Sequence, residues 1–120
     1  NQVLPMNSIM FTSLSYGFGK IGITYSNSLT NQQINSIIVD EGSHDFKFVY
    51  YLLRHYKDRI LSYNAGIVTP IVPKSVFEKI KVFVPIKKKL ETKIASILSA
   101  YDDLIENNLK RIKLLEEKAY

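Results

Sequence analysis

The C-terminal part of the sequence constrains the fold more than any other feature. Residues 88–118 contain neither proline nor glycine and consist largely of good helix formers, so they predict one continuous helix. Mostly apolar residues recur along it at alternating intervals of four and three, which is the heptad pattern of a coiled-coil seam. The seam positions are Ile94, Leu98, Tyr101, Ile105, Asn108, Ile112, Leu115 and Ala119. A helix of about 30 residues rises about 45 Å, which is more than the preceding residues can cover, so we expect it to pair with another helix.

One seam position is polar. A buried amide at Asn108 costs stability unless it is hydrogen-bonded, and such residues commonly fix the register and orientation of a coiled coil. The alternative is that Asn108 lies at a frayed or solvent-open part of the seam. The sequence leaves both interpretations open.

The first half of the chain has the short periods of β structure. Residues 1–25 predict short strands and turns, with strict alternation of apolar and small residues over 21–25. Residues 34–39 form a short apolar run after a polar cluster, which predicts a buried strand.

A helix is predicted over 46–63, where apolar residues recur at helical spacing. Ser43 can cap its first turn, Asp45 suits the positive end of its dipole, and residues 64–66 provide a stop. Three prolines between 67 and 86 exclude a long helix there.

In that proline-rich segment we expect one helical turn at Ser75–Lys79 and a strand at Ile80–Val84. The predicted class is therefore α+β, with a small mixed globular domain over 1–86. One long helix that pairs in a coiled coil follows over 87–120.

Charge is distributed unevenly along the chain. Eleven basic and three acidic side chains give residues 47–93 a charge of +8, whereas 1–46 carry −2 and 94–120 carry −1, for a net charge of +5. A basic segment favours polyanions, because neutralising phosphates releases condensed counterions. The alternative is a set of solvated lysines on exposed helix faces.

The sequence offers no catalytic centre. The absence of cysteine excludes thiol nucleophiles, disulfides and Cys-ligated metal sites, and it suits a cytoplasmic protein. The only histidines, His44 and His55, have no partners at metal-ligand spacing. Asp102, Asp103 and Glu106 are expected on a solvated face of the long helix. No apolar run is long enough to cross a membrane.

Residues 17–22 match the G-x-G-x-x-G pattern letter for letter. A dinucleotide site also needs a helix that begins within the motif and meets the pyrophosphate. The residues that follow, 23–28, predict a strand and a turn instead. We therefore interpret the glycines as a turn between strands, where positive φ is needed.

Several short segments between residues 19 and 119 occur in a distinctive order. They are Gly19-Lys20-Ile21-Gly22, Thr30-Asn31-Gln32-Gln33-Ile34, Phe48-Val49-Tyr50-Tyr51-Leu52-Leu53, Gly66, Phe77-Glu78-Lys79-Ile80-Lys81-Val82, Pro85 and the run from Ile94 to Asn108. In this order they resemble the DNA-specificity (S) subunit of type I restriction-modification systems. More narrowly, they are similar to the second half of one target recognition domain with the helix that follows. Family members often carry Glu-Gln where this chain has Leu90-Glu91, and a complete subunit has two domains and two helices.

The resemblance implies a chain without catalysis or cofactors of its own. In such subunits the globular domain reads half of a split double-stranded DNA target. The long helices pair and dock methyltransferase (M) subunits, which carry S-adenosylmethionine, while the restriction (R) subunit uses ATP and magnesium. Self-association through the helix is a further partner interaction that we consider.

DNA contacts are expected from amide groups that pair with base edges and from basic groups that hold phosphates. The predicted residues are Lys20, Asn31, Gln32, Lys47, Arg54, Lys57, Arg59 and Lys74. For Asn31 and Gln32 the alternative is a purely structural role in a turn. For the whole chain the alternative is an assembly adaptor that uses only its helix.

Overall fold

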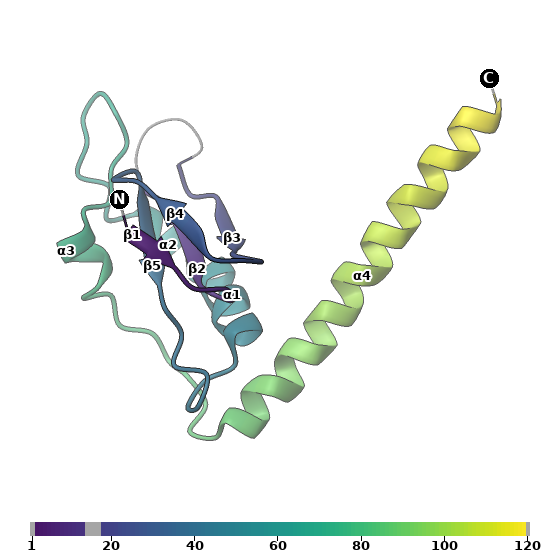
Figure 1. The fold of residues 1–120 in the computed structure, drawn as a ribbon. Helices are drawn as coiled ribbons and strands as arrows, with labels where there is room; N and C mark the ends of the chain where they lie inside the picture. Colours follow the sequence, from purple (N-terminus) through teal and green to yellow (C-terminus); the bar gives the residue numbers. More distant parts are fainter. Residues whose placement is uncertain (1, 14–17, 120) are drawn as a thin grey trace.

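The computed structural model describes residues 2–13 and 18–119 (Figure 1). Its strands are β1 (Gln2–Leu4), β2 (Ile9–Thr12), β3 (Ile21–Ile23), β4 (Ser28–Thr30) and β5 (Ile34–Ile37). Its helices are α1 (Phe46–His55), α2 (Lys57–Leu61), α3 (Lys74–Phe77) and α4 (Lys88–Ala119). The predicted α+β class, with a small mixed body followed by one long helix, is confirmed.

The core lies between a three-stranded antiparallel sheet and the helices that follow it. The sheet has the order β3-β2-β5, and β1 pairs separately with β4. The central strand β2 carries Ile9 and Phe11, both fully buried, and these pack with Leu53, Ile60 and Val72. A strand whose alternate residues are buried is what a sheet covered on one face requires.

The helix predicted over 46–63 is interrupted at Tyr56, so that prediction was wrong in extent. Asp45 caps α1 by accepting a hydrogen bond from the Phe48 amide at 3.1 Å. At Tyr56 the backbone ψ is 8°, which is outside the helical range, and α2 begins at the next residue. The break lies between Leu53 and Ile60, both of which are buried in the core.

Gly66 does not end a helix, because α2 already ends at Leu61. The glycine lies in the following loop instead, where a Cβ would be 1.7 Å from the carbonyl oxygen of Thr69. Only a residue without a side chain fits such a close approach. The role of the glycine is therefore to let the loop turn back on itself.

The strand predicted at Ile80–Val84 does not form. Ile80 and Val82 are half-buried while Lys81 and Phe83 are exposed, but Val84 is exposed as well, so burial alternates only over 80–83. The segment nevertheless has no ladder partner; the Phe83 amide donates to the Tyr56 hydroxyl at 3.4 Å. The alternating burial over 80–83 arises because this segment lies in an extended conformation against the helices, without pairing in a sheet. The helical turn expected nearby does form, as α3.

The glycine-rich stretch leads into a strand, as expected. Gly17 lies outside the described residues, whereas Gly19 has φ of 87° and β3 begins at Ile21. No helix starts within the described part of the motif. The dinucleotide interpretation therefore remains excluded.

Helix α4 leaves the body as a long rod (Figure 1). Its first turns pack on α1, and from residue 103 to 119 its side chains are exposed. Within the described ranges 2–13 and 18–119, no helix is long and apolar enough to span a bilayer. The helix forms where the sequence predicts it because glycine and proline are absent along its length.

Candidate nucleic-acid interface

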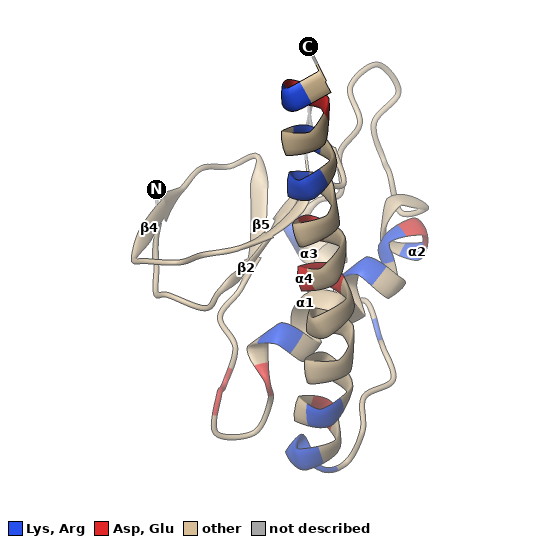
Figure 2. Cartoon of the chain, turned by 90° about the vertical axis from the view of Figure 1, so that its right-hand side faces the viewer, with Lys and Arg blue, Asp and Glu red and all other residues tan. Residues whose placement is uncertain are grey.

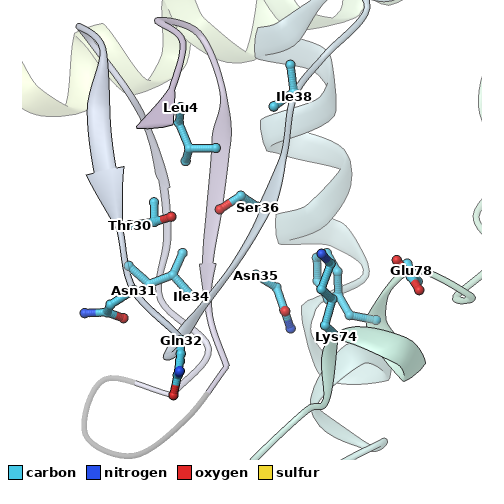
Figure 3. A pocket seen from close by; sticks show the side chains of 11 residues that line it. Leu4, Thr30, Asn31, Gln32, Ile34, Asn35, Ser36, Ile38, Lys74 and Glu78 are labelled. Carbon is cyan, nitrogen blue, oxygen red and sulfur yellow. The ribbon is translucent and has the colours of Figure 1, made fainter. Parts of the chain in front are cut away.

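A polar hollow of about 610 Å³ opens at one end of the body (Figure 3). Its walls come from β1, the β4–β5 turn, β5 and α3. The lining residues are Leu4, Thr30, Asn31, Gln32, Ile34, Asn35, Ser36, Ile38, Lys74, Phe77 and Glu78. The hollow thus brings together three of the predicted DNA contacts: Asn31, Gln32 and Lys74.

The amide groups at the rim are held by the turn between β4 and β5. The Asn31 carboxamide oxygen accepts a hydrogen bond from the Gln33 amide at 2.9 Å, which forms an Asx turn. The predicted structural role of Asn31 is therefore real. Its side chain and that of Gln32 are nevertheless exposed to solvent. Amides in such positions can pair with the donor and acceptor groups of a base edge.

A buried amide supports the hollow from behind. Asn35 lies opposite Phe11 in the sheet and is 8% exposed. It donates hydrogen bonds to the Ser13 hydroxyl at 2.6 Å and to the Val72 carbonyl at 3.0 Å. The Val72 amide donates to the Ser13 carbonyl at 2.9 Å. These bonds tie the segment that leads into α3 to the sheet, and so place Lys74 in the lining of the same hollow, across from Asn31 and Gln32 (Figure 3).

Two more predicted residues lie close to this end of the sheet. Lys20 follows Gly19, whose amide donates to the Thr12 carbonyl at 2.8 Å at the end of β2. The Lys57 side chain packs against the same turn, since its Cε is 3.1 Å from where a Gly19 Cβ would be. Lys20 and Lys57 therefore add positive charge to the end of the body that carries Asn31.

The remaining predicted DNA contacts lie elsewhere. Arg54 is 3.6 Å from Asp102 on α4 and stacks over the rings of Tyr50 and Tyr51. Lys47 lines grooves between α1 and α4. Figure 2 shows that α4 carries both basic and acidic residues along its length. Arg59 stacks over Tyr56 at 5.9 Å. The structure does not gather these residues with the hollow, and their role in DNA binding stays a prediction.

The start of α4 is attached to the body through a carboxylate that sequence reasoning missed. Glu91 is fully buried. Its carboxylate lies 3.0 Å from His44 Nδ1 and accepts a hydrogen bond from the Asp45 amide at 3.1 Å. Thr92 donates to the Asp45 carboxylate at 3.0 Å. The departure from the family pattern at Leu90-Glu91 was the only sequence signal at this position.

A second attachment lies further along α4. The Tyr51 hydroxyl donates to the Asp102 carboxylate at 2.5 Å, and Arg54 approaches the same oxygen. Burial, and to a lesser degree the bond to Asp102, raises the pKa of Tyr51. The expectation that Asp102 belongs to a solvated face was therefore wrong, because it contacts α1. Among the described residues, no group of three or more acidic or histidine side chains could hold a metal ion.

The heptad seam is left open by the body. Ile94 is half-buried, and the exposed fractions of the large apolar seam residues after it lie between 38% at Leu98 and 68% at Leu115. The further exposed seam residues are Tyr101, Ile105, Asn108, Ile112 and Ala119. The contacts with α1 use Ala95 and Asp102, which lie beside the seam at about 75° from its midline. Glu91, seven residues before Leu98, lies on the same face as the seam but at its buried N-terminal end. The seam is thus available to a second helix while α4 stays attached.

Comparisons with known proteins agree with this architecture. A family model described as the type I restriction modification DNA specificity domain matches residues 1–117. The type I restriction enzyme MjaIX specificity subunit of Methanocaldococcus jannaschii is 28% identical over 120 residues, which cover 98% of this chain and 27% of the relative. The MjaVIII specificity subunit of the same organism is 32% identical over 99 residues, covering 82% of this chain and 22% of that protein.

A solved structure shares the fold. The crystal structure of a type I restriction-modification system S subunit from M. genitalium superposes with a TM-score of 0.73 at 23% identity, covering 87% of this chain and 28% of that one. This chain spans about a quarter of the length of these relatives. The resemblance inferred from the sequence is confirmed: the chain belongs to the family of type I restriction-modification DNA specificity domains.

Proposed function

We propose that this chain reads half of a bipartite DNA target as a non-catalytic specificity component of a type I restriction-modification complex. The observation that carries the proposal is one hollow lined by the exposed side chains of Asn31, Gln32 and Lys74, on a chain of a DNA specificity family. Phosphate contacts fix the register of a protein on a duplex, while base-edge contacts give specificity. The phosphate contacts can be made by Lys20, Lys57 and Lys74.

The long helix provides the second part of the proposed function. The open seam of α4 pairs with another helix and docks the methyltransferase (M) subunits, with the restriction (R) subunit joining in the full complex. The chain then needs no cofactor, because S-adenosylmethionine belongs to the M subunit, and ATP with magnesium to the R subunit. Such a complex acts on double-stranded DNA in the cytoplasm.

One observation favours a second candidate function, an assembly adaptor that does not read DNA. The seam alone gives α4 an exposed apolar stripe, including Ile105 and Leu115, which needs a partner whether or not the body binds DNA. An adaptor would keep its partners after any change to the hollow. A DNA reader would lose affinity for the duplex.

Charge reversal at the hollow and at the neighbouring Lys57 separates the DNA reader from the adaptor. We expect Lys57→Glu with Lys74→Glu to weaken duplex binding by the assembled complex. The plot of the logarithm of the binding constant against the logarithm of salt concentration should become shallower by about 0.9 for each phosphate that is no longer neutralised. Arg54 is left intact because it contacts Asp102. The matched control is Lys113→Glu, which is on the exposed part of α4.

The base-reading residue is tested separately. Gln32→Ala should lower discrimination between target and non-target duplexes by about 1–3 kcal/mol while leaving non-specific affinity unchanged. Discrimination would be measured by competition binding with the complex. Unchanged affinity and unchanged discrimination in all of these variants would refute the DNA-reading role and favour the adaptor.

A further inference from the structure

The N-terminal half of α4 is held to α1, and to the residues just before α1, at two separated points. The proximal point joins Glu91 to His44 and to the Asp45 amide. The distal point joins Asp102 to Tyr51 and Arg54. We propose that Glu91 and Asp102 are positioning residues which fix the angle between the DNA-reading body and α4, and so determine the number of base pairs between the two half-targets. This inference rests on the proposed function.

The proximal point uses a group that is costly to bury. Glu91 is fully buried, and a buried carboxylate is destabilising unless it is paired and hydrogen-bonded. His44 and the Asp45 amide supply those partners, while Asp45 itself also caps α1 and accepts from Thr92. Such geometry-dependent polar contacts favour one arrangement over alternatives more than they add stability.

The two points together, here called the clamp, fix the direction of the α4 axis relative to α1. His44 and Asp45 precede the first turn of α1, whereas Tyr51 and Arg54 lie near its end. On α4 the points are eleven residues apart, or about 16 Å at the helical rise. Ala95, which is 2% exposed, packs between them. One contact would allow the helix to pivot, but two contacts at this separation do not.

Because α4 continues well beyond the clamp, a small change in its angle to the body causes a larger displacement at its C-terminal end. From Asp102 to Ala119 the helix continues for about 25 Å at about 1.5 Å per residue, with side chains exposed from residue 103 onward. A tilt of about 10° at the clamp would therefore displace the tip by about 4 Å. One base-pair step of B-DNA is about 3.4 Å. Small changes at the clamp thus correspond to a full step in half-target spacing.

A partner on the seam does not replace the clamp. Asp102 lies beside the seam, about 75° around α4 from its midline, whereas Glu91 lies on the seam face but one heptad before Leu98, where the body already buries it. A helix paired at Tyr101 and Ile105 can therefore leave Glu91 and Asp102 in contact with α1. The partner determines where α4 lies in the assembly, while the clamp determines how the body is oriented on α4.

The test measures the preferred number of base pairs between the half-targets rather than the stability of the protein. Half-targets are first selected from a random duplex pool with the unaltered complex of specificity and methyltransferase subunits. Binding is then measured on duplexes with the same half-targets and spacers that differ by one base pair at a time. We expect one preferred spacer for the unaltered complex. In Glu91→Gln and Asp102→Ala, preference over the neighbouring spacers should fall at least about tenfold, consistent with the loss of a charged hydrogen bond.

The controls separate positioning from folding and from function. Asp103→Ala changes an adjacent exposed carboxylate and should keep the spacer preference. Asp102→Ala lies at the partly exposed point, so it provides the measurement if Glu91→Gln fails to fold. Unchanged spacer preference in folded clamp variants would overturn this inference alone. Selection of no duplex by the unaltered complex would overturn the proposed function, and the inference with it.

Discussion

Replacing the buried amide of Asn35 tests how the hollow is built. In Asn35→Ala the chain loses the hydrogen bonds to the Ser13 hydroxyl and the Val72 carbonyl, and it leaves that carbonyl without this donor. A typical intramolecular bond contributes about 1 kcal/mol net, and an unsatisfied buried group costs about 1–3 kcal/mol. We therefore expect the free energy of unfolding to fall by about 2–4 kcal/mol.

Urea unfolding followed by circular dichroism measures this loss. At an m-value of about 2 kcal/mol per molar urea, a loss of about 3 kcal/mol lowers the midpoint by about 1.5 M. Protein concentrations must be matched, because association through α4 links stability to concentration. The control is Gln32→Ala at the exposed rim, which should change stability by less than about 0.5 kcal/mol. A midpoint for Asn35→Ala equal to that of the control would refute the reasoning.

Three further predictions concern α4, its attachment and the loop before α3. Ile105→Asp places a charge in the open seam and should abolish association with a partner helix. Light scattering measures this as a lower mass than that of the unaltered protein, and an equal mass would contradict the prediction. Because the pKa of Tyr51 is raised in the folded chain, its contribution is complete below about pH 10 and is lost as the pH rises through the raised pKa. The unfolding midpoint should therefore fall more steeply with rising alkaline pH than it does in Tyr51→Phe, and parallel curves would contradict a raised pKa of Tyr51. Gly66→Ala drives a methyl group into the Thr69 carbonyl and should destabilise the loop by at least about 2 kcal/mol, seen as a lower melting temperature.

The long helix was predictable because its signals are local. The absence of glycine and proline and the heptad interval both lie within the segment, and α4 spans Lys88–Ala119 as expected. The segment at Ile80–Val84 shows the limit of such patterns. Its alternation records burial over the helices, and nothing in the sequence distinguishes an extended strap from a strand with a ladder partner.

The attachments of α4 could not be predicted because they join distant residues. His44 and Glu91 are 47 positions apart, and Tyr51 and Asp102 are 51 apart. Local patterns therefore provided no reason to separate Arg54, which contacts α4, from Lys74, which lines the hollow. Composition identified the basic segment, but only the packing of α3 against the sheet shows that Lys74 lines the same hollow as Asn31.

The central claim is that the body of this chain binds duplex DNA electrostatically and reads it through its amides. The most direct measurement is the affinity of the assembled complex for its selected duplex over a series of salt concentrations. We predict that the logarithm of the binding constant falls linearly with the logarithm of salt concentration, with a slope of about −0.9 for each phosphate held. A complex with no salt-sensitive affinity for any duplex would contradict this claim.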